Sequence, residues 1–335
     1  MRRIPSYPLR LSAPGNLLLA GEYAILEPGG LGVGAAVDVR LIGTLQEASS
    51  TQIESIWPGV HLTWSPQSHA GEFVGTLYEA LGLHDPGVPP FHLTLDSSAF
   101  FTQDGRKLGL GSSAALAVVL TAVAHLLKES WDDSAVPEPR LYQSKLFKTK
   151  LTQQAIQAHR TAQGGKGSGY DVAASCWGGL GLFTGGRTPS WTPASWSLPP
   201  FRLFSGPEAV RTVSAIGAYQ AWKTAQPHEA QEFLRQSNSA VKHFFSAKTW
   251  SERRLAWEDA KQLSLSLGRQ IGVSAELEST FPPSYFVKAL GAGNESGLVV
   301  QDEGNHANNH PQDQDSGARA QTFPLQLAED GVRLE

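Results

Sequence analysis

Residues 107–128, KLGLGSSAALAVVLTAVAHLLK, join a glycine-rich turn to a long and almost wholly apolar helix. Gly109 and Gly111 allow positive φ angles and a close approach to the backbone. Ser112 or Ser113 can cap the helix that follows. Amides in the first helical turn have no intrahelical partner, and the helix dipole adds partial positive charge there. The turn is therefore suited to an anion, and phosphate is the first expectation.

A tight connection that ends in a good helix cap is the simpler interpretation of this turn, because glycine-rich turns often precede helices. The motif alone does not separate a phosphate loop from such a connection. Other stretches of the chain decide between them.

Composition bounds the classes of protein to consider. With 335 residues, the chain is longer than one typical domain, which favours two domains that share an interface. We expect a first domain over residues 1–198 and a second over 199–335, with a polar and structure-poor insert near 302–320. The two histidines in that insert are interpreted as solvated loop residues rather than metal ligands.

Charge and hydropathy argue against two kinds of partner. The net charge is −4, and no basic stripe interleaved with aromatics is present, so we expect no nucleic-acid partner. The longest apolar run, residues 114–127, is too short to span a bilayer, and the first residues lack the features of a signal peptide. These observations predict a cytoplasmic protein that does not associate with membranes, and they leave the oligomeric state open, a homodimer included.

Cys176 is the only cysteine, which excludes an internal disulfide. We expect it to be a small buried residue rather than a nucleophile, because no Cys-His arrangement accompanies it.

A second glycine-rich stretch is QGGKGSGYD, residues 163–171. Its glycines hold the backbone open, and Asp171 lies at the start of the next helix. An aspartate there commonly serves only as a first-turn charge. A carboxylate flanked by glycines, with Lys166 and Ser168 close by, also suits a substrate hydroxyl.

The N-terminal region contains a charge within an apolar run. Residues 9–12 predict a short strand that enters a turn at 13–16, and LLLAGEYAIL follows at 17–26. Glu22 interrupts this run, and a buried glutamate is costly unless it is paired. It is either a buried paired group or a solvent-facing residue at a bend.

Three stretches together resemble the motifs of the galactokinase, homoserine kinase, mevalonate kinase and phosphomevalonate kinase (GHMP) family. They are SAPGNLLLAGEYAIL at 12–26, KLGLGSSAALAVVL at 107–120 and KALGAGNESGLVV at 288–300. Within the family, AGEYAILEPG at 20–29 and AHRTAQG followed by GSGYDVAA at 158–174 resemble phosphomevalonate kinases.

The resemblance implies an α+β fold of two domains. The N-terminal one would be like ribosomal protein S5 domain 2, with left-handed β-α-β character, and the C-terminal one ferredoxin-like. ATP and a small-molecule acceptor would lie in the cleft between them. The implied activity is the ATP- and Mg²⁺-dependent phosphorylation of 5-phosphomevalonate to 5-diphosphomevalonate in isoprenoid precursor synthesis. Mevalonate or another small alcohol is the alternative acceptor.

The resemblance also implies roles for individual residues. Asp171 would lie beside the acceptor, and Ser113 rather than Ser112 would ligate Mg²⁺. The implied ATP-binding residues are Lys107, Gly109, Leu110, Gly111, Ser112, Ser113 and Ala114. The implied acceptor-side residues are Gly21, Glu22, Tyr23, Ser168, Gly169, Thr212, Gly291, Ala292 and Gly293. Cationic candidates for an acceptor phosphate are Arg160, Arg211 and Lys288, although each could equally be a surface charge.

The chain departs from the family pattern at Asn16, where the motif usually has lysine. Loss of such an electrostatic contact to the transferring phosphoryl group can cost on the order of 100-fold in rate. Lys166 either substitutes for it or is a solvated loop lysine. The third motif is altered as well, with Asn294-Glu295-Ser296-Gly297 where glycines and an aspartate are usual. Both departures motivate a hypothesis of another class, a non-catalytic nucleotide- or metabolite-binding homologue.

Overall fold

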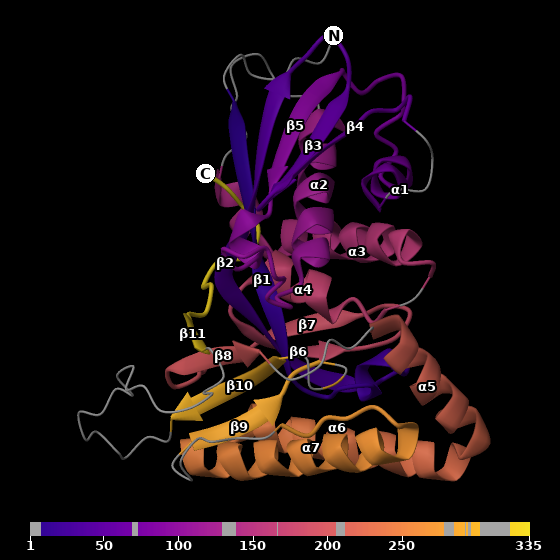
Figure 1. Ribbon diagram of the computed structural model, residues 1–335, viewed down its shortest axis with the longest axis vertical. Helices are drawn as coiled ribbons and strands as arrows, with labels where there is room; N and C mark the ends of the chain where they lie inside the picture. Colours follow the sequence, from indigo (N-terminus) through magenta and orange to yellow (C-terminus); the bar gives the residue numbers. More distant parts are fainter. Residues whose placement is uncertain are drawn as a thin grey trace.

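The computed structural model describes residues 8–68, 73–128, 139–165, 167–205, 212–277, 285–291, 293, 296–301 and 322–335. Its strands form two sheets that lie one above the other in Figure 1, with helices packed on each. This mixture of helices and largely antiparallel strands confirms the α+β class predicted from the sequence.

The larger sheet has eight strands in the described part of the chain, and its main path runs β12-β1-β2-β5-β3-β4, with β6 pairing β2 and β7. The strands are β1 (Leu9–Ala20), β2 (Leu31–Glu47), β3 (Gln52–Trp57), β4 (Val60–Trp64), β5 (Phe91–Asp96), β6 (Leu180–Thr184), β7 (Ser190–Pro193) and β12 (Arg333–Leu334). Among the described strands, only β3 and β5 pair in parallel. Four helices pack beside this sheet: α1 (Phe73–Ala80), α2 (Ser112–Lys128), α3 (Lys145–Ala162) and α4 (Tyr170–Trp177).

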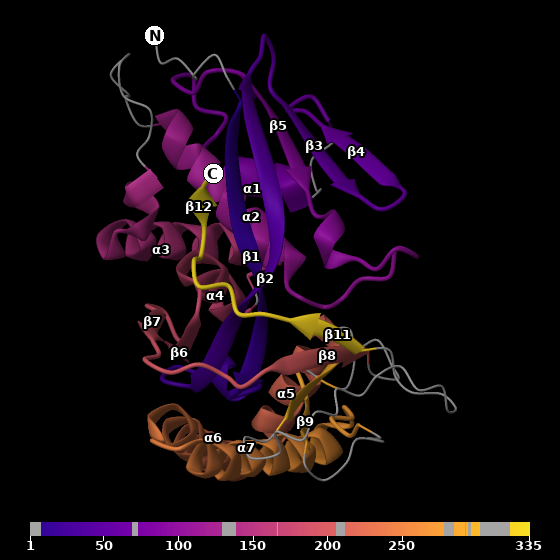
Figure 2. The same cartoon turned by 90° about the vertical axis from the view of Figure 1, so that its left-hand side faces the viewer.

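The smaller sheet has the order β11-β8-β10-β9. Its strands are β8 (Phe201–Ser205), β9 (Tyr285–Ala289), β10 (Ser296–Gln301) and β11 (Thr322–Leu325), and the helices of this half are α5 (Thr212–Ala225), α6 (Pro227–Ser246) and α7 (Trp250–Ile271). Short 3₁₀ turns occupy Ala24–Leu26, Ser98–Phe100 and Pro139–Gln143. Figures 1 and 2 show α6 and α7 side by side beneath the small sheet.

Helix α2 is buried on all sides, as its nearly continuous apolar sequence requires. Every residue from Ala117 to Leu127 is buried. The helix packs against β1, α3 and α4. Its N-terminus is thereby fixed at the end of the large sheet that faces the small sheet, and this fixes the glycine turn that precedes it.

The prediction of a short strand followed by a turn at residues 13–16 was wrong. β1 continues through this segment to Ala20, and its register with β2 shifts after Pro14 and again after Leu18. Irregularities of this kind let a strand accommodate a proline and bend without leaving the sheet. The bend directs the end of β1 toward the small sheet.

The end of the chain returns to the large sheet. β11 pairs with β8 in the small sheet, whereas β12 pairs with β1. Figure 2 shows this final segment crossing from one sheet to the other. The domain boundary at residue 198 remains a prediction, and the polar segment 302–320 lies outside the described residues.

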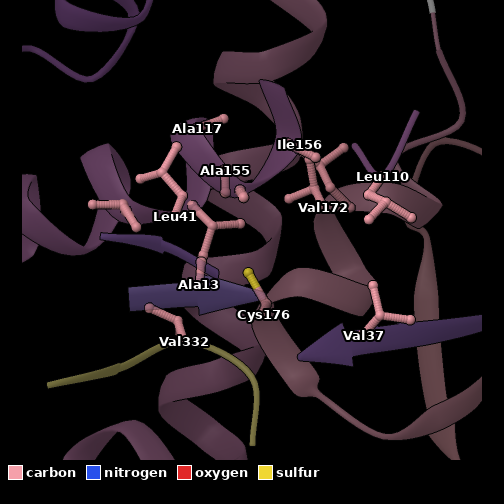
Figure 3. Close-up of a cluster of buried hydrophobic side chains, with 14 of the residues drawn as sticks. Ala13, Val37, Leu41, Leu110, Ala117, Ala155, Ile156, Val172, Cys176 and Val332 are labelled. Atoms are coloured by element: carbon pink, nitrogen blue, oxygen red, sulfur yellow. The ribbon is translucent and has the colours of Figure 1, made fainter. Parts of the chain in front are cut away.

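Cys176 lies in the core of the upper half. Figure 3 shows its sulfur among apolar side chains, with Ala13 and Val332 close by. Burial raises the pKa of the Cys176 thiol to about 12, and the residue has no exposed surface. The prediction of a small buried cysteine is confirmed. Within the described parts of the chain, no helix combines the length and the apolarity needed to cross a bilayer.

Candidate active site

A cavity of about 330 Å³ lies where the two halves meet, and all the glycine-rich stretches reach it. Its polar lining residues are Asn16, Glu22, Tyr23, Lys107, Ser113, Gln163, Ser168, Tyr170, Asp171 and Ser296, and its lining glycines are Gly109, Gly111, Gly167, Gly291 and Gly293. An apolar wall is formed by Leu17, Leu18, Ile25, Leu26, Ile216 and Leu290. Segments far apart in the sequence thus form a single mixed polar and apolar site.

The glycine turn before α2 is held directly on β1. Gly109 and Gly111 have φ angles of 73° and 72°, which side chains with a Cβ rarely adopt. A Cβ added to Gly111 would lie 2.2 Å from Asn16 Nδ2. The Asn16 N–H donates to the Leu110 carbonyl at 2.9 Å. The Leu110 side chain points into the core cluster in Figure 3, so the turn is anchored from both sides.

This turn has the features of a phosphate cradle. Its glycines leave backbone open toward the cavity, and α2 begins directly behind them, so the free amides of the helix terminus face the same space. Ser113 lines the cavity, whereas Leu110, Ser112 and Ala114 do not. The hydroxyl of Ser113 is therefore the side-chain oxygen of this segment that could hold a Mg²⁺ ion. Two backbone groups of this segment are already paired within the protein, because Asn16 donates to the Leu110 carbonyl and the Ala114 N–H donates to the Gly111 carbonyl at 3.1 Å.

Asn16 is a buried brace between the turn and α4. Its side chain is 2% exposed, and Nδ2 donates to the Ser175 hydroxyl at 3.2 Å. The amide contacts Gly111 on one side and Ser175 on the other, so it fixes the distance between α4 and the glycine turn. At the position of the expected lysine, the chain has a neutral and hydrogen-bonded group.

Asp171 lies in the first turn of α4 at the cavity surface. Its Oδ1 accepts a hydrogen bond from the Val172 N–H at 3.0 Å. The helix begins after Gly169, whose φ of 88° and tight contact with Ile156 exclude a side chain. Gly169 shapes the helix start and does not line the cavity, whereas Ser168 does.

Arg160 holds the loop that carries Ser168. Its guanidinium donates to the carbonyls of Gly167 at 3.1 Å, Ser168 at 2.6 Å and Gly186 at 3.4 Å. These contacts direct the charge at the protein backbone. Arg160 therefore holds this loop through its side chain, so the surface-charge interpretation is wrong, while its assignment to an acceptor phosphate stays a prediction.

Glu22 and Lys288 form a buried ion pair between the two halves. Their residues are 5% and 2% exposed, and the Ser264 hydroxyl donates to Glu22 Oε2 at 3.1 Å. The paired alternative for Glu22 is confirmed, and the solvent-facing one is wrong. Lys288 is neither a surface charge nor a free phosphate ligand, because its ammonium is bound to this carboxylate.

Tyr23 contributes a neutral aromatic wall. Burial, with a further contribution from Glu22, raises the pKa of its phenol well above the usual range. Its ring lies 5.3 Å from that of Tyr219. Tyr23 is the non-glycine residue with a positive φ, 63°, in the described structure. Gly21 enables this turn: a Cβ there would lie 2.2 Å from the Leu31 carbonyl, and Gly21 does not line the cavity.

Some predicted site residues lie outside the described structure. These are Lys166, Arg211, Ala292, Asn294 and Glu295. Thr212 begins α5, but its side chain also falls outside the description. Gly291 and Gly293, on either side of Ala292, do line the cavity.

Sequence reasoning missed His159, which lies beneath the cavity floor at 2% exposure. Its ring nitrogens approach Ser113 Oγ at 3.4 Å and Asp171 Oδ2 at 3.9 Å. The available signal was the i, i+4 spacing of His159 and Gln163, which places both side chains on one face of α3. Ser175 and Ile216 were also missed, since each meets the site only through tertiary contacts.

Comparisons with known proteins agree with this arrangement. A model of the family described as GHMP kinases N terminal domain matches residues 70–179. A phosphomevalonate kinase from Streptomyces sp. (strain CL190) is 31% identical over 195 residues, or 50% of this chain and 47% of that protein. A phosphomevalonate kinase from Saccharolobus solfataricus is 27% identical over 174 residues, or 51% of this chain and 48% of that protein. The chain thus spans about half the length of the curated relatives it matches.

Two solved structures share the fold. The Lin0012 protein from Listeria innocua matches with a TM-score of 0.74 at 19% identity, covering 96% of this chain and 100% of that chain. The Streptococcus pneumoniae phosphomevalonate kinase, solved in complex with phosphomevalonate and AMPPNP, matches with a TM-score of 0.63 at 18% identity. That match covers 87% of this chain and 92% of the other. At these identities the likeness establishes the fold.

Proposed function

We propose that this chain is an ATP-dependent kinase that converts 5-phosphomevalonate to 5-diphosphomevalonate. The proposal is supported by the match of residues 70–179 to the model described as GHMP kinases N terminal domain, and by the fold shared with the solved structures. The observation that carries the proposal is the meeting of Ser113, the glycine turn and Asp171 in one cavity. The named activity of the two curated relatives supports phosphomevalonate as the acceptor.

In the proposed reaction, the glycine turn and the start of α2 hold the triphosphate. Their backbone donors offset phosphate charge, and a Mg²⁺ ion held by Ser113 would supply further neutralisation when bound. An oxygen of the acceptor phosphate forms a bond to the γ-phosphorus of ATP as the bond to ADP breaks. Asp171 would orient that acceptor, which is already anionic and needs little help from a base.

The acceptor phosphate requires cationic partners. Among the described lining residues, Lys107 is the one with a permanently positive side chain. Lys166 lies outside the described residues, but in the sequence it directly precedes Gly167, which lines the cavity. It is therefore the second candidate, and its charge would take over the role of the lysine that Asn16 replaces.

The test is coupled ADP release with 5-phosphomevalonate and with mevalonate, in the presence of ATP and Mg²⁺. We expect turnover with 5-phosphomevalonate, and a loss on the order of 100-fold in kcat in Asp171→Asn, because the amide replaces one acceptor oxygen by a donor and so misplaces the substrate that Asp171 would orient. Asp259→Asn is the matched control, because Asp259 is an exposed carboxylate on α7. Turnover with mevalonate alone would reassign the acceptor.

A non-catalytic homologue is the second candidate function, and the observation that favours it is the neutral, hydrogen-bonded Asn16 at the lysine position. It predicts that AMPPNP binds while neither acceptor supports ADP release. Activity that appears only in Asn16→Lys would support this candidate, whereas turnover by the parent chain would exclude it.

A further inference from the structure

His159 occupies a fixed position between the two sides of the proposed site. It lies in the last turn of α3 and is 2% exposed. Its ring packs edge-on against Phe73, with centroids 5.9 Å apart and planes at 86°. It does not line the cavity, so it reaches bound molecules only through other residues.

The two ring nitrogens face different functional groups. Nε2 lies 3.4 Å from Ser113 Oγ, at the start of α2. Nδ1 lies 3.9 Å from Asp171 Oδ2, at the start of α4. One rigid ring therefore connects the proposed metal ligand with the proposed acceptor residue.

Gln163 contacts the same ring nitrogen as Ser113. Its amide nitrogen lies 3.2 Å from His159 Nε2, and an amide nitrogen in this orientation can only donate. With Gln163 as the donor, Nε2 is the acceptor and the ring proton belongs to Nδ1, on the side of the Asp171 carboxylate.

This tautomer also orients the Ser113 hydroxyl. The single lone pair of Nε2 is shared when the Gln163 amide at 3.2 Å and the Ser113 hydroxyl at 3.4 Å both donate to it. In that arrangement the hydroxyl directs its proton at the ring, and the oxygen lone pairs remain free for the cavity. A hard cation such as Mg²⁺ binds oxygen lone pairs, so this is the orientation that a metal-binding serine needs. Partners behind a metal ligand commonly fix its orientation in this way.

We propose that His159 is a positioning residue that sets the Ser113 hydroxyl and the Asp171 carboxylate with a single ring. The inference rests on the proposed function and deepens it, because it assigns the coupling between the nucleotide side and the acceptor side of that site. The contrasting assignment is a buried histidine that only fills space.

Two conservative substitutions separate these contacts. The Gln side chain in His159→Gln reaches the position of Nε2 and can retain the contact with Ser113. The shorter Asn side chain in His159→Asn reaches the position of Nδ1 and can retain the contact with Asp171. His159→Phe keeps the ring but removes both contacts.

The first measurement is calorimetric binding of AMPPNP with and without Mg²⁺. The measured quantity is the factor by which Mg²⁺ increases the affinity for AMPPNP. We expect this factor to be 10- to 100-fold smaller in His159→Asn and His159→Phe than in the parent, a typical cost of losing a partner behind a metal ligand. His159→Gln should retain most of that gain. The control is His125→Asn, because His125 is a buried histidine of α2 that contacts Gln154 away from the cavity.

The second measurement is 5-phosphomevalonate binding and kcat in the same variants. Here we expect the opposite order. His159→Asn should have an affinity for 5-phosphomevalonate and a kcat close to those of the parent, and both should be lower in His159→Gln. Thermal melting identifies any variant that does not fold, and the Asn and Gln variants decide the question if His159→Phe is lost.

Equal effects of the Asn and Gln variants in both measurements, or effects no larger than in His125→Asn, would overturn the positioning role. Failure of the proposed function is distinguishable, because it appears as absent ADP release in the parent chain. The metal-dependent AMPPNP measurement still tests the contact with Ser113 in that case.

Discussion

Replacement of Lys288 by methionine should destabilise the protein more than the same replacement in any exposed ion pair. The Lys288 and Glu22 side chains are 2% and 3% exposed. Lys288→Met leaves the Glu22 carboxylate buried, with the Ser264 hydroxyl as its described donor. Breaking one side of a buried ion pair costs about 3–5 kcal/mol, because the remaining charge stays out of water without compensation.

The double variant Glu22→Gln with Lys288→Met tests this cause. It removes both charges at similar side-chain volume, and such replacements are often neutral or stabilising. We therefore expect it to be clearly more stable than Lys288→Met alone. A favourable coupling of this kind separates the cost of an orphaned charge from a simple loss of packing.

Urea unfolding followed by tryptophan fluorescence is the assay, since the Trp257 ring packs 4.5 Å from Phe286 in the same half. With a slope of about 3 kcal/mol per molar urea, the single variant should lower the midpoint by roughly 1–2 M. Arg235→Met is the control, because its pair with Glu232 is exposed and should leave the midpoint unchanged. A double variant as unstable as Lys288→Met would refute the reasoning.

Three further predictions concern the site and the core. Gly111→Ala should weaken AMPPNP binding at least 10-fold, since its Cβ would lie 2.2 Å from Asn16 Nδ2 and a cradle displaced by even 1 Å is costly. Gly272→Ala is the comparison for calorimetry, because Gly272 has a similar φ of 70°, an added Cβ would meet no atom within 4 Å, and the residue does not line the cavity; an equal loss would argue against the contact. Ser175→Ala should lower the unfolding free energy by about 1–3 kcal/mol in urea titrations, because it leaves the buried Asn16 amide without its partner. Cys176 should resist a thiol reagent at pH 8.5 in the folded protein and react after unfolding, because burial raises its pKa to about 12 and only the thiolate attacks.

The positions of the glycine-rich stretches were predictable because each one carries its own local signal. Left-handed φ angles at Gly109 and Gly111 require glycine whatever surrounds them. The apolar sequence of α2 likewise predicts a buried helix. Such features depend on a few neighbouring residues, so the sequence is sufficient to find them.

Pairings across the fold were not predictable in the same way. Glu22 and Lys288 are separated by 266 positions, and nothing local distinguishes Lys288 from a surface lysine. Arg160 was difficult for another reason. The glycine loop that it holds begins only a few residues later in the sequence, but its charge indicated a ligand of the acceptor phosphate rather than a contact with backbone carbonyls. Whether a charged side chain faces substrate or protein depends on which backbone carbonyls the fold brings within its reach.

The contacts of Asn16 give the departure from the lysine motif a structural meaning. A lysine at this position would have to direct its ammonium past Gly111, where the Asn16 amide now lies, and it would remove the hydrogen bond to Ser175. The short amide instead fixes the glycine turn against α4, the helix that carries Asp171. In the proposed kinase, the residue change would exchange a positive charge for a link between the phosphate side and the acceptor side. The compensating charge would then come from another residue near the cavity, and Lys107, a described lining residue, is a candidate.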